Sequence, residues 1–310
     1  MARFLAKRVL EAIPVVIGIT LFAFLLIHLI PGDPVKLLLG PRATPANITS
    51  LRTELNLNRS LPWQYVHFLG NAASLSFGKS ITYRSTVGSI VSGRVEASFL
   101  LIGYGLLVGL IVALPLAMLA AMRRNRFADS AIRMSTTFLF AMPSFWLGLL
   151  LVIVFGLKLG WFPTSGYGST FTEHLRSLTL PAITIGLYVA PVLLRLQRSS
   201  LIDTLQSEFV EATRARGVSE RRVLGLHVTR SSMTSTITFL GIFAGVLLSG
   251  AVVVENVFSI PGMGSLLVDS VTQRDYPVIQ ALTLIFGLTI VVVSILTDVL
   301  YAVVDPRIRL

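Results

Sequence analysis

The chain of 310 residues contains no cysteine, and charged residues make up only 13% of it. The absence of cysteine excludes disulfide bonds, thiolate metal sites and cysteine nucleophiles within this chain. Soluble domains carry charge on about a quarter of their residues. The low charge therefore argues against an ordinary soluble domain, and 54% hydrophobic residues with a mean hydropathy of +0.78 indicate a membrane-embedded chain.

Six long apolar stretches of the chain contain no Asp, Glu, Lys or Arg. About 20 helical residues cross the hydrocarbon core of a bilayer, so each stretch is near or above the length of a span. The stretches are residues 13–30, 99–122, 134–157, 177–194, 231–254 and 276–297. We therefore predict an all-α membrane protein with six transmembrane helices and both termini on one side.

Lys and Arg gather in the connections on one side of the predicted bundle. These are Arg3, Lys7, Arg8, Arg123, Arg124, Arg126, Arg133, the basic residues of the run 195–230, Arg307 and Arg309. The short opposite connections hold only Lys158, Arg176 and Arg274. The positive-inside rule places the basic side, with both termini, in the cytoplasm. The net charge of +11 mostly reflects this topology rather than a nucleic-acid-binding face.

Residues 31–97 are predicted to lie on the extracytoplasmic side. The first span ends at Pro31-Gly32-Asp33-Pro34 without a small-x-small cleavage site, so we expect it to be retained. Thr44-Pro45 and Leu61-Pro62 are each typical of a helix start. The segment is too short for a domain with a large core of its own. We expect it to cover helix ends, to dock an extracytoplasmic partner, or both.

Motifs for catalysis or nucleotide binding are absent from the sequence. Gly78-Lys79-Ser80 resembles the end of a phosphate-binding loop, but Ala73 stands where that motif needs its first glycine. There is no H-E-x-x-H, no G-x-S-x-G and no close carboxylate pair inside a span. Ionisable residues near the spans lie close to span ends, where interface placement is the simpler explanation: Glu11, His28, Glu255 and Asp298. The chain must therefore take energy from a partner or be a passive pore.

The connection between the fourth and fifth predicted spans carries more charge than any other stretch of its length. Residues 207–216 interleave charged and apolar side chains and are predicted to form a short amphipathic helix that Gly217 ends. Ser219 is expected to cap a second helix. This pattern favours a rigid lever that receives force from a soluble partner, with a solvated basic loop as the alternative.

The same connection reads Glu211-Ala212-Thr213, three residues, Gly217, nine residues and His227. This spacing resembles the E-A-A loop of ABC importer membrane subunits, with Thr213 in place of the family's second alanine. The ending H-V-T-R at residues 227–230 departs from the broad I-x-L-P pattern and is similar to the peptide-importer branch. Further matches to that branch cover essentially the whole chain: P-G-D-P-V at 31–35, M-P-S-F-W-L-G-L-L-L at 142–151, L-G-W-F-P-T-S-G at 159–166, G-A-V-V-V-E-N-V-F-S-I-P-G-M-G at 250–264, R-D-Y-P-V-I-Q at 274–280 and D-P-R-I-R at 305–309.

The chain thus resembles a permease subunit of bacterial dipeptide and oligopeptide ABC importers. The resemblance implies a non-catalytic inner-membrane subunit with six transmembrane helices of the importer type, a cytoplasmic coupling helix and an extracytoplasmic helical segment between helices 1 and 2. The implied partners are a second, similar permease, two cytoplasmic ATPases that use ATP and Mg, an extracytoplasmic substrate-binding protein and the lipid bilayer. No cofactor, metal or nucleic acid is expected to bind this chain.

Three parts are predicted along the chain. Residues 1–30 hold the cytoplasmic N-terminus and the first span, residues 31–97 form the extracytoplasmic segment, and residues 98–310 form the permease core. The core holds spans at about 99–122, 134–157, 177–199, 231–256 and 276–304. Residues 203–230 are called the coupling loop throughout.

Three sets of candidate site residues follow. The resemblance, with our additions, assigns ATPase coupling to Glu208, Phe209, Glu211, Ala212, Thr213, Arg214, Arg216, Gly217, His227 and Arg230. Helix breaks in spans tend to line cavities, so the pathway or gate candidates are Met142, Pro143, Ser144 and Phe145, with kinking and packing as the simpler alternative. The candidates for docking the binding protein are Asp33, Trp63, Tyr65, Glu255, Arg274 and Asp275.

Short peptides are the substrate that the resemblance favours, delivered by the binding protein and moved by alternating access. Nickel and glutathione systems have similar permeases, so both stay open as alternatives. The lack of a His or carboxylate cluster inside the spans disfavours a metal-binding pore. An autonomous channel or secondary carrier is the rival from another class.

Overall fold

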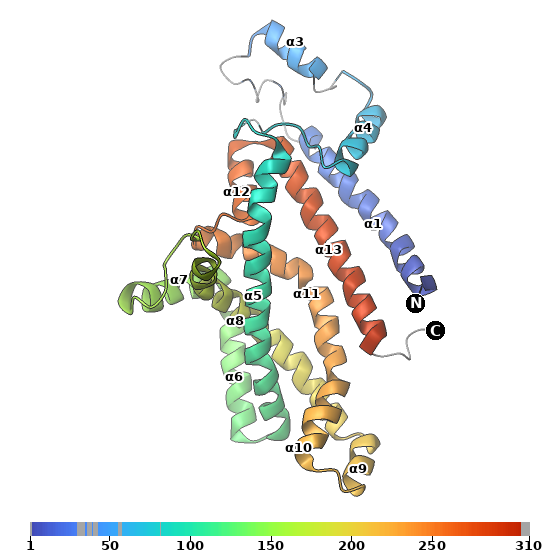
Figure 1. Ribbon diagram of the computed structural model, residues 1–310, viewed down its shortest axis with the longest axis vertical. Helices are drawn as coiled ribbons and strands as arrows, with labels where there is room; N and C mark the ends of the chain where they lie inside the picture. Colours follow the sequence, from blue (N-terminus) through green and yellow to red (C-terminus); the bar gives the residue numbers. More distant parts are fainter. Residues whose placement is uncertain are drawn as a thin grey trace. The chain divides into compact units, whose positions relative to one another are not determined.

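The computed structural model describes residues 2–29, 35, 39, 43–54, 58–80 and 82–304 (Figure 1). Within these residues the regular structure is helical, apart from one isolated bridge between Lys79 and Thr86. The helices are α1 (Ala2–Leu29), α3 (Pro45–Glu54), α4 (Leu61–Ala73), α5 (Val87–Met122), α6 (Phe127–Ala141), α7 (Ser144–Leu151), η2 (Val152–Lys158), α8 (Phe171–Leu205), α9 (Glu208–Ala215), α10 (Glu220–Arg222), η3 (Val223–Val228), α11 (Thr229–Val257), α12 (Met263–Gln273) and α13 (Tyr276–Val304). The prediction of an all-α chain is confirmed for this part of the sequence.

The chain divides into two units of packed helices. Unit 1 comprises, besides Met1, residues 96–265 and 293–310, and unit 2 comprises residues 2–95 and 266–292. The centre of unit 1 is α8, against which α6, α7 and α11 all pack. These neighbours bury most of the apolar stretch of α8, which continues through Pro181 and Pro191 without a break.

Small residues let α5 and α8 approach closely in unit 1. A Cβ added at Gly109 would lie 3.3 Å from the carbonyl oxygen of Gly186, and one added at Gly186 would lie 2.9 Å from the backbone nitrogen of Gly109. A Cβ at Gly105 would meet the side chain of Ile185 at 2.7 Å. Close backbone approach at small residues is a common way to pack helices in membranes. These glycines therefore set the spacing of the two helices.

Residues 134–157 do not form one straight helix, and the interruption that the sequence predicted at Met142-Pro143-Ser144 is confirmed. α6 ends at Ala141, α7 begins at Ser144, and the two helices are bent by 101°. Proline offers no N–H and disfavours helical geometry in the residue before it. Met142, which precedes Pro143, accordingly has the extended angles φ −81° and ψ 132°. The π-helix η2 then continues α7.

Among the described residues, four helices are long and apolar enough to cross a membrane: α1, α5, α8 and α13. Counting the bent pair of α6 with α7 and η2 as one span raises the number to five. α11 covers the fifth predicted span as one helix, although several of its side chains lie outside the described part. The sixfold span prediction therefore stays a prediction.

In unit 2, α1 packs against α4 through polar and aromatic side chains. Thr20 and Tyr65 share a hydrogen bond of 2.8 Å between their hydroxyls, and the rings of Phe24 and Tyr65 lie 5.4 Å apart. α13 joins α1 through Gln280, whose side-chain amide donates to the carbonyl of Ala23 at 3.1 Å. These contacts hold the first span to residues of the last.

The two short helices between α1 and α5 begin where the sequence predicted them. α3 begins at Pro45, and the Thr44 hydroxyl oxygen accepts a hydrogen bond of 3.3 Å from the N–H of Asn47. α4 begins at Leu61, with Pro62 in its first turn. Both starts follow the rule that proline suits a first helical turn, where its missing N–H costs nothing.

Candidate coupling site

The coupling loop contains the helix that the sequence predicted at residues 207–216. α9 runs from Glu208 to Ala215, and Ser207 precedes it in an extended conformation. Gly217 follows at a φ of +76°, a left-handed conformation that glycine adopts without steric cost. A Cβ at Gly217 would meet open space, so the backbone angle rather than crowding requires the glycine. The predicted corner is confirmed.

The inner face of α9 is anchored in the core of unit 1. Val210 has 0% of its surface exposed and belongs to the main hydrophobic cluster, and Thr213 is also buried. The Thr213 hydroxyl donates a 2.7 Å hydrogen bond to the carbonyl of Phe209. The residue that departs from the family's E-A-A pattern is thus a small, satisfied, inward-facing side chain, and it leaves the outer face of α9 unchanged.

The outer face of α9 is exposed and mixes charges with one aromatic ring. Its exposed residues include Glu208, Phe209, Glu211, Ala212 and Arg214, and the exposed Arg216 follows directly after the helix. Phe209 is 55% exposed. A large apolar side chain within a polar rim is a usual form of protein interface. α9 lies at the same end of unit 1 as the turn between α5 and α6, which carries Arg123, Arg124 and Arg126 (Figure 1).

A two-pronged ion pair spans the corner at Gly217. Arg214 Nη2 lies 2.6 Å from Glu220 Oε1, and its Nε lies 3.1 Å from Oε2. The hydrogen bond from Arg214 holds the pKa of Glu220 below its usual range, and the hydrogen bond to Glu220 raises the pKa of Arg214. Arg214, predicted to contact a partner, therefore also fixes α9 against α10.

The second predicted helix begins at Glu220 as α10 and continues through the π-helix η3 into α11. Ser219 occupies the N-cap position, but its hydroxyl makes no capping hydrogen bond, so the predicted side-chain cap is wrong. His227 lies in η3, and its side chain is outside the described part of the chain. Arg230 lies exposed in the first turn of α11.

An ion pair at the base of the coupling loop was missed by sequence reasoning. Asp129 on α6 is fully buried, and its two carboxylate oxygens accept from Arg198 Nε at 2.7 Å and Nη2 at 2.6 Å. The N–H of Asn125 donates to the same carboxylate at 3.0 Å. The signal in the sequence was that Asp129 is a lone acidic residue in a basic connection. A buried carboxylate needs a partner of opposite charge, so this pattern could have indicated an ion pair.

The neighbouring residue on α8 ties that helix to α11. The side-chain amide of Gln197 donates to the Ser232 hydroxyl at 2.9 Å, and the Thr236 hydroxyl donates to Gln197 Oε1 at 2.8 Å. All three side chains are buried. We call these contacts, with the Asp129–Arg198 pair, the α6–α8–α11 brace. It joins three helices, and its residues on α8 and α11 lie close in sequence to the two ends of the coupling loop.

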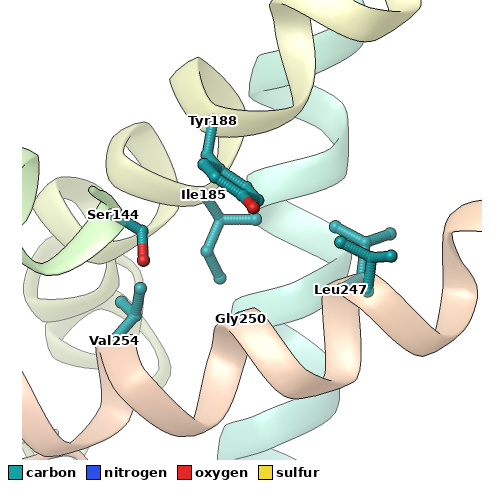
Figure 2. Close-up of a pocket in the computed structure, with 7 residues that line it drawn as sticks. Ser144, Ile185, Tyr188, Leu247, Gly250 and Val254 are labelled. Carbon is teal, nitrogen blue, oxygen red and sulfur yellow. The ribbon is translucent and has the colours of Figure 1, made fainter. Parts of the chain in front are cut away.

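Of the four pathway candidates, Met142 and Pro143 form the break between α6 and α7. Ser144 lines a pocket. Figure 2 shows Ser144 near Tyr188 and Ile185 of α8 and Gly250 and Val254 of α11. The remaining lining residues are Val246 and Leu247. Phe145 is not among them and is 48% exposed. The pocket is small and mostly apolar, with hydroxyl groups only from Ser144 and Tyr188.

The docking candidates separate into exposed and buried residues. Asp33 lies outside the described residues. Trp63 is exposed and stacks on His67 with ring centroids 5.1 Å apart, whereas Tyr65 is held against α1. Arg274 is exposed at a φ of +57°. Trp63 and Arg274 are therefore the described candidates best placed to meet a partner.

The carboxyl groups of Glu255 and Asp275 are buried, so this structure does not support a direct docking contact through them. Asp275 accepts hydrogen bonds from the Ser80 hydroxyl and from the N–H of Thr82, the latter at 3.2 Å. Glu255 accepts from the Ser98 hydroxyl at 2.6 Å and from the N–H of Ser265 at 2.9 Å. Both acids hold backbone segments in place instead.

The chain matches known transport proteins over its whole length. Residues 113–310 match the family model described as binding-protein-dependent transport system inner membrane component, and residues 1–92 match the model of that component's N-terminal region. The glutathione transport system permease protein GsiC of Escherichia coli K12 is 38% identical over 312 residues, covering 100% of this chain and 99% of the relative. A putative peptide permease protein of Brucella ovis is 35% identical over 317 residues, with the same coverage.

A solved structure shares the fold. An inward-facing form of the MetNI methionine ABC transporter superposes with a TM-score of 0.58 at 14% sequence identity, covering 70% of this chain and 96% of that one. At this identity the likeness concerns the fold alone. Together with the family models and the relatives, it shows that this chain belongs to the binding-protein-dependent transport system inner membrane components, the multi-pass permease subunits of ABC importers.

Proposed function

We propose that this chain passes short peptides, a class that includes the tripeptide glutathione, through the inner membrane. The observation that carries the proposal is the full-length similarity to a glutathione permease and to a putative peptide permease. The two names support the two substrates equally. A second, similar permease, two ATPases and an extracytoplasmic binding protein would complete the importer.

Energy would enter through α9. Val210 anchors the helix, the pair Arg214–Glu220 stiffens its corner, and the exposed ring of Phe209 is available to a groove on a cytoplasmic ATPase. A partner can shift an alternating-access equilibrium only through contacts that differ between its two states. α9 with its corner offers such a contact, because a push on it reaches α8 and α11 through covalent continuity.

The pocket between α7, α8 and α11 marks our candidate for the narrow part of the substrate path. Its walls are mostly apolar, and the hydroxyls of Ser144 and Tyr188 could bond the amide groups of a passing peptide. Gly250 lines it, and a Cβ at that position meets open space. A larger side chain at Gly250 would therefore fill the pocket without displacing the helices.

The pocket is tested with Gly250→Leu. We expect it to reduce uptake at least about tenfold while ATP hydrolysis in the assembled importer persists, since a filled path blocks cargo and leaves α9 intact. Gly103→Leu is the matched control, because Gly103 is exposed on α5 with open space around its Cβ. Equal uptake by the two variants would remove the pocket from the path.

The function itself is tested by reconstituting this chain with its second permease, ATPases and binding protein in liposomes. We expect ATP-dependent uptake of a labelled dipeptide or of labelled glutathione, and competition between the two will identify the preferred substrate. Uptake of neither, or uptake of nickel instead, would overturn the substrate proposal. Substrate flux through this chain alone without ATPases would favour a channel or secondary carrier.

Glu211→Lys, which reverses a charge on the outer face of α9, should lower uptake per ATP hydrolysed.

A further inference from the structure

A buried carboxyl group closes the corner between α11 and α12. Glu255, in the last turn of α11, has 1% of its surface exposed. Its Oε1 accepts a 2.6 Å hydrogen bond from the hydroxyl of Ser98 on α5, and its Oε2 accepts a 2.9 Å bond from the N–H of Ser265. Ser98 Oγ in turn accepts a 2.8 Å bond from the N–H of Met263. We call these three hydrogen bonds the Glu255 clamp.

The clamp replaces the usual cap of α12. The first N–H groups of a helix have no partner inside the helix, and those of Met263 and Ser265 belong to the first turn of α12. Here their acceptors come from α5 and α11 rather than from the residue that precedes α12. Three elements are thus joined by a set of buried polar contacts, each of which costs free energy if its partner is lost.

The Glu255 side chain leaves no room for a Cβ at Gly262, and Val252 and Glu255 together leave none at Gly264. A Cβ added at Gly262 would collide with the carboxyl carbon and both oxygens of Glu255. One added at Gly264 would lie 2.9 Å from Glu255 Oε2 and 2.6 Å from the Cα of Val252. Neither glycine has a positive φ among the backbone angles of the described residues. The G-M-G spacing therefore serves the close approach of a side chain.

The clamp lies at the end of α11 that is far from the coupling loop. α11 begins directly after η3 of the coupling loop and ends at the clamp. Its near end is tied to α8 by Gln197, and its far end is tied to α5 and α12 by Glu255. A helix fixed at both ends by buried polar contacts transmits displacement between them rather than absorbing it by local repacking.

We propose that Glu255 is a positioning residue that transmits movement of α11 to α5 and α12, and so connects the coupling loop with the opposite end of unit 1. This inference rests on the proposed importer function. Docking of the substrate-loaded binding protein at the extracytoplasmic side would move the clamp and α11. This movement would set the position of α9 against the ATPases. The carboxyl group itself does not contact the binding protein, because it is buried.

The test uses the complete importer in liposomes with Ser98→Ala and Glu255→Gln. Ser98→Ala removes the bridging hydroxyl, and Glu255→Gln keeps the size of the side chain but directs an amide group at one of two donors. We expect assembly and basal ATP hydrolysis to stay within about twofold of the wild type, and binding-protein-stimulated hydrolysis and uptake to fall roughly tenfold. The concentration of binding protein that gives half-maximal stimulation should not change, because the docking surface is intact.

Ser249→Ala is the matched control, since Ser249 is exposed and its hydroxyl bonds to the carbonyl of Gly245 in its own helix. A second arm compares Gly262→Ala in the wild type and in Glu255→Ala. In the wild type, Gly262→Ala should lower binding-protein-stimulated hydrolysis and uptake. In the Glu255→Ala background the same substitution should cause little further decrease, because the carboxyl group with which the new Cβ collides is gone.

Three outcomes overturn the inference. Full stimulation and uptake in both Ser98→Ala and Glu255→Gln would show that the clamp transmits nothing. A parallel fall of assembly, basal hydrolysis and uptake would reduce the clamp to a structural role. A raised half-maximal concentration with unchanged maximal stimulation would assign it to docking. Failure of the proposed function is distinct, because the wild-type importer would then show no ATP-dependent uptake.

Discussion

At Gly217 a single backbone angle determines the direction of the chain between α9 and α10. The φ of +76° costs L-residues with branched side chains about 1–2 kcal/mol, and no neighbouring atom competes for the space of a Cβ. The strain can therefore be separated from steric bulk by choosing residues that differ in tolerance of this angle.

Gly217→Val should lower uptake per ATP hydrolysed about fivefold or more, because the corner must open or distort to relieve strain. Gly217→Asn should retain most of the coupling, since asparagine tolerates left-handed angles. Parallel measurement of ATP hydrolysis and uptake in liposomes checks both. If the two variants lose coupling equally, the bulk of the side chain at the corner matters and the backbone angle does not.

The Arg214–Glu220 pair makes the stiffness of the corner depend on pH. The pKa of Glu220 is lowered by its hydrogen bond with Arg214. The contribution of the pair is therefore complete above the ordinary glutamate pKa of about 4.3 and is lost as the pH falls through the lower folded value. At pH 7 hydrogen exchange in α9 should be roughly two- to fivefold slower in the wild type than in Glu220→Gln.

That difference between the two chains should vanish at low pH, where Glu220 is protonated. Comparing the variants at the same pH cancels the intrinsic pH dependence of exchange. A difference that persists unchanged to about pH 2 would mean that the side chain acts by packing and not by its charge.

Among the described helices, α8 is held in place both by apolar packing and by hydrogen bonds to its neighbours. Its inner residues pack against three helices, and residues 197 and 198 bond to α11 and α6. The apolar run at 177–194 predicted that this helix exists, but not its length or its polar ties. Hydrogen-bond partners 35 and 69 residues away have no periodic pattern in the sequence.

Asp129→Asn should destabilise unit 1 by about 2 kcal/mol, because Arg198 then loses the charge of its fully buried acceptor. The charge exchange Asp129→Arg with Arg198→Asp should recover part of this loss. Recovery is incomplete, since the bond from the N–H of Asn125 is not restored. Thermal unfolding in detergent measures all three chains.

Arg133→Ala supplies the control for this series. Arg133 Nε lies 3.6 Å from Asp129 Oδ1 and its side chain is exposed, so its loss should cost under about 0.5 kcal/mol. If Arg133→Ala and Asp129→Asn destabilise equally, the effect comes from the local charge balance of the turn and not from the brace.

For the whole molecule, the absence of cysteine is an experimental advantage. Any introduced cysteine is the only thiol in the chain. Ser219→Cys lies in the coupling loop, and Ser165→Cys lies between η2 and α8, both at exposed positions. The charge distribution predicts that they lie on opposite sides of the membrane.

In inverted and right-side-out vesicles, a membrane-impermeant maleimide should label Ser219→Cys only from the cytoplasmic side and Ser165→Cys only from the other side. Arg124→Cys, in the turn between α5 and α6, should follow Ser219→Cys. Labelling of residues 165 and 219 from the same side would contradict the six-span topology, because α8 would then not cross the membrane. Labelling of residues 124 and 165 from the same side would show that the bent pair of α6 and α7 re-enters the membrane without crossing it.

The sequence by itself determined the class of this protein and the position of the short helix α9 with its glycine corner. Apolar runs, basic connections and a glycine after a short amphipathic helix depend only on residues that are neighbours in the sequence. They can therefore be recognised without knowing which distant residues they contact. Only the tertiary structure decided that the third predicted span bends by 101°, that Glu255 and Asp275 hold backbone instead of facing a partner, and that Asp129 meets Arg198. These outcomes depend on which distant groups the fold brings together, and burial then makes each polar group find an acceptor or donor.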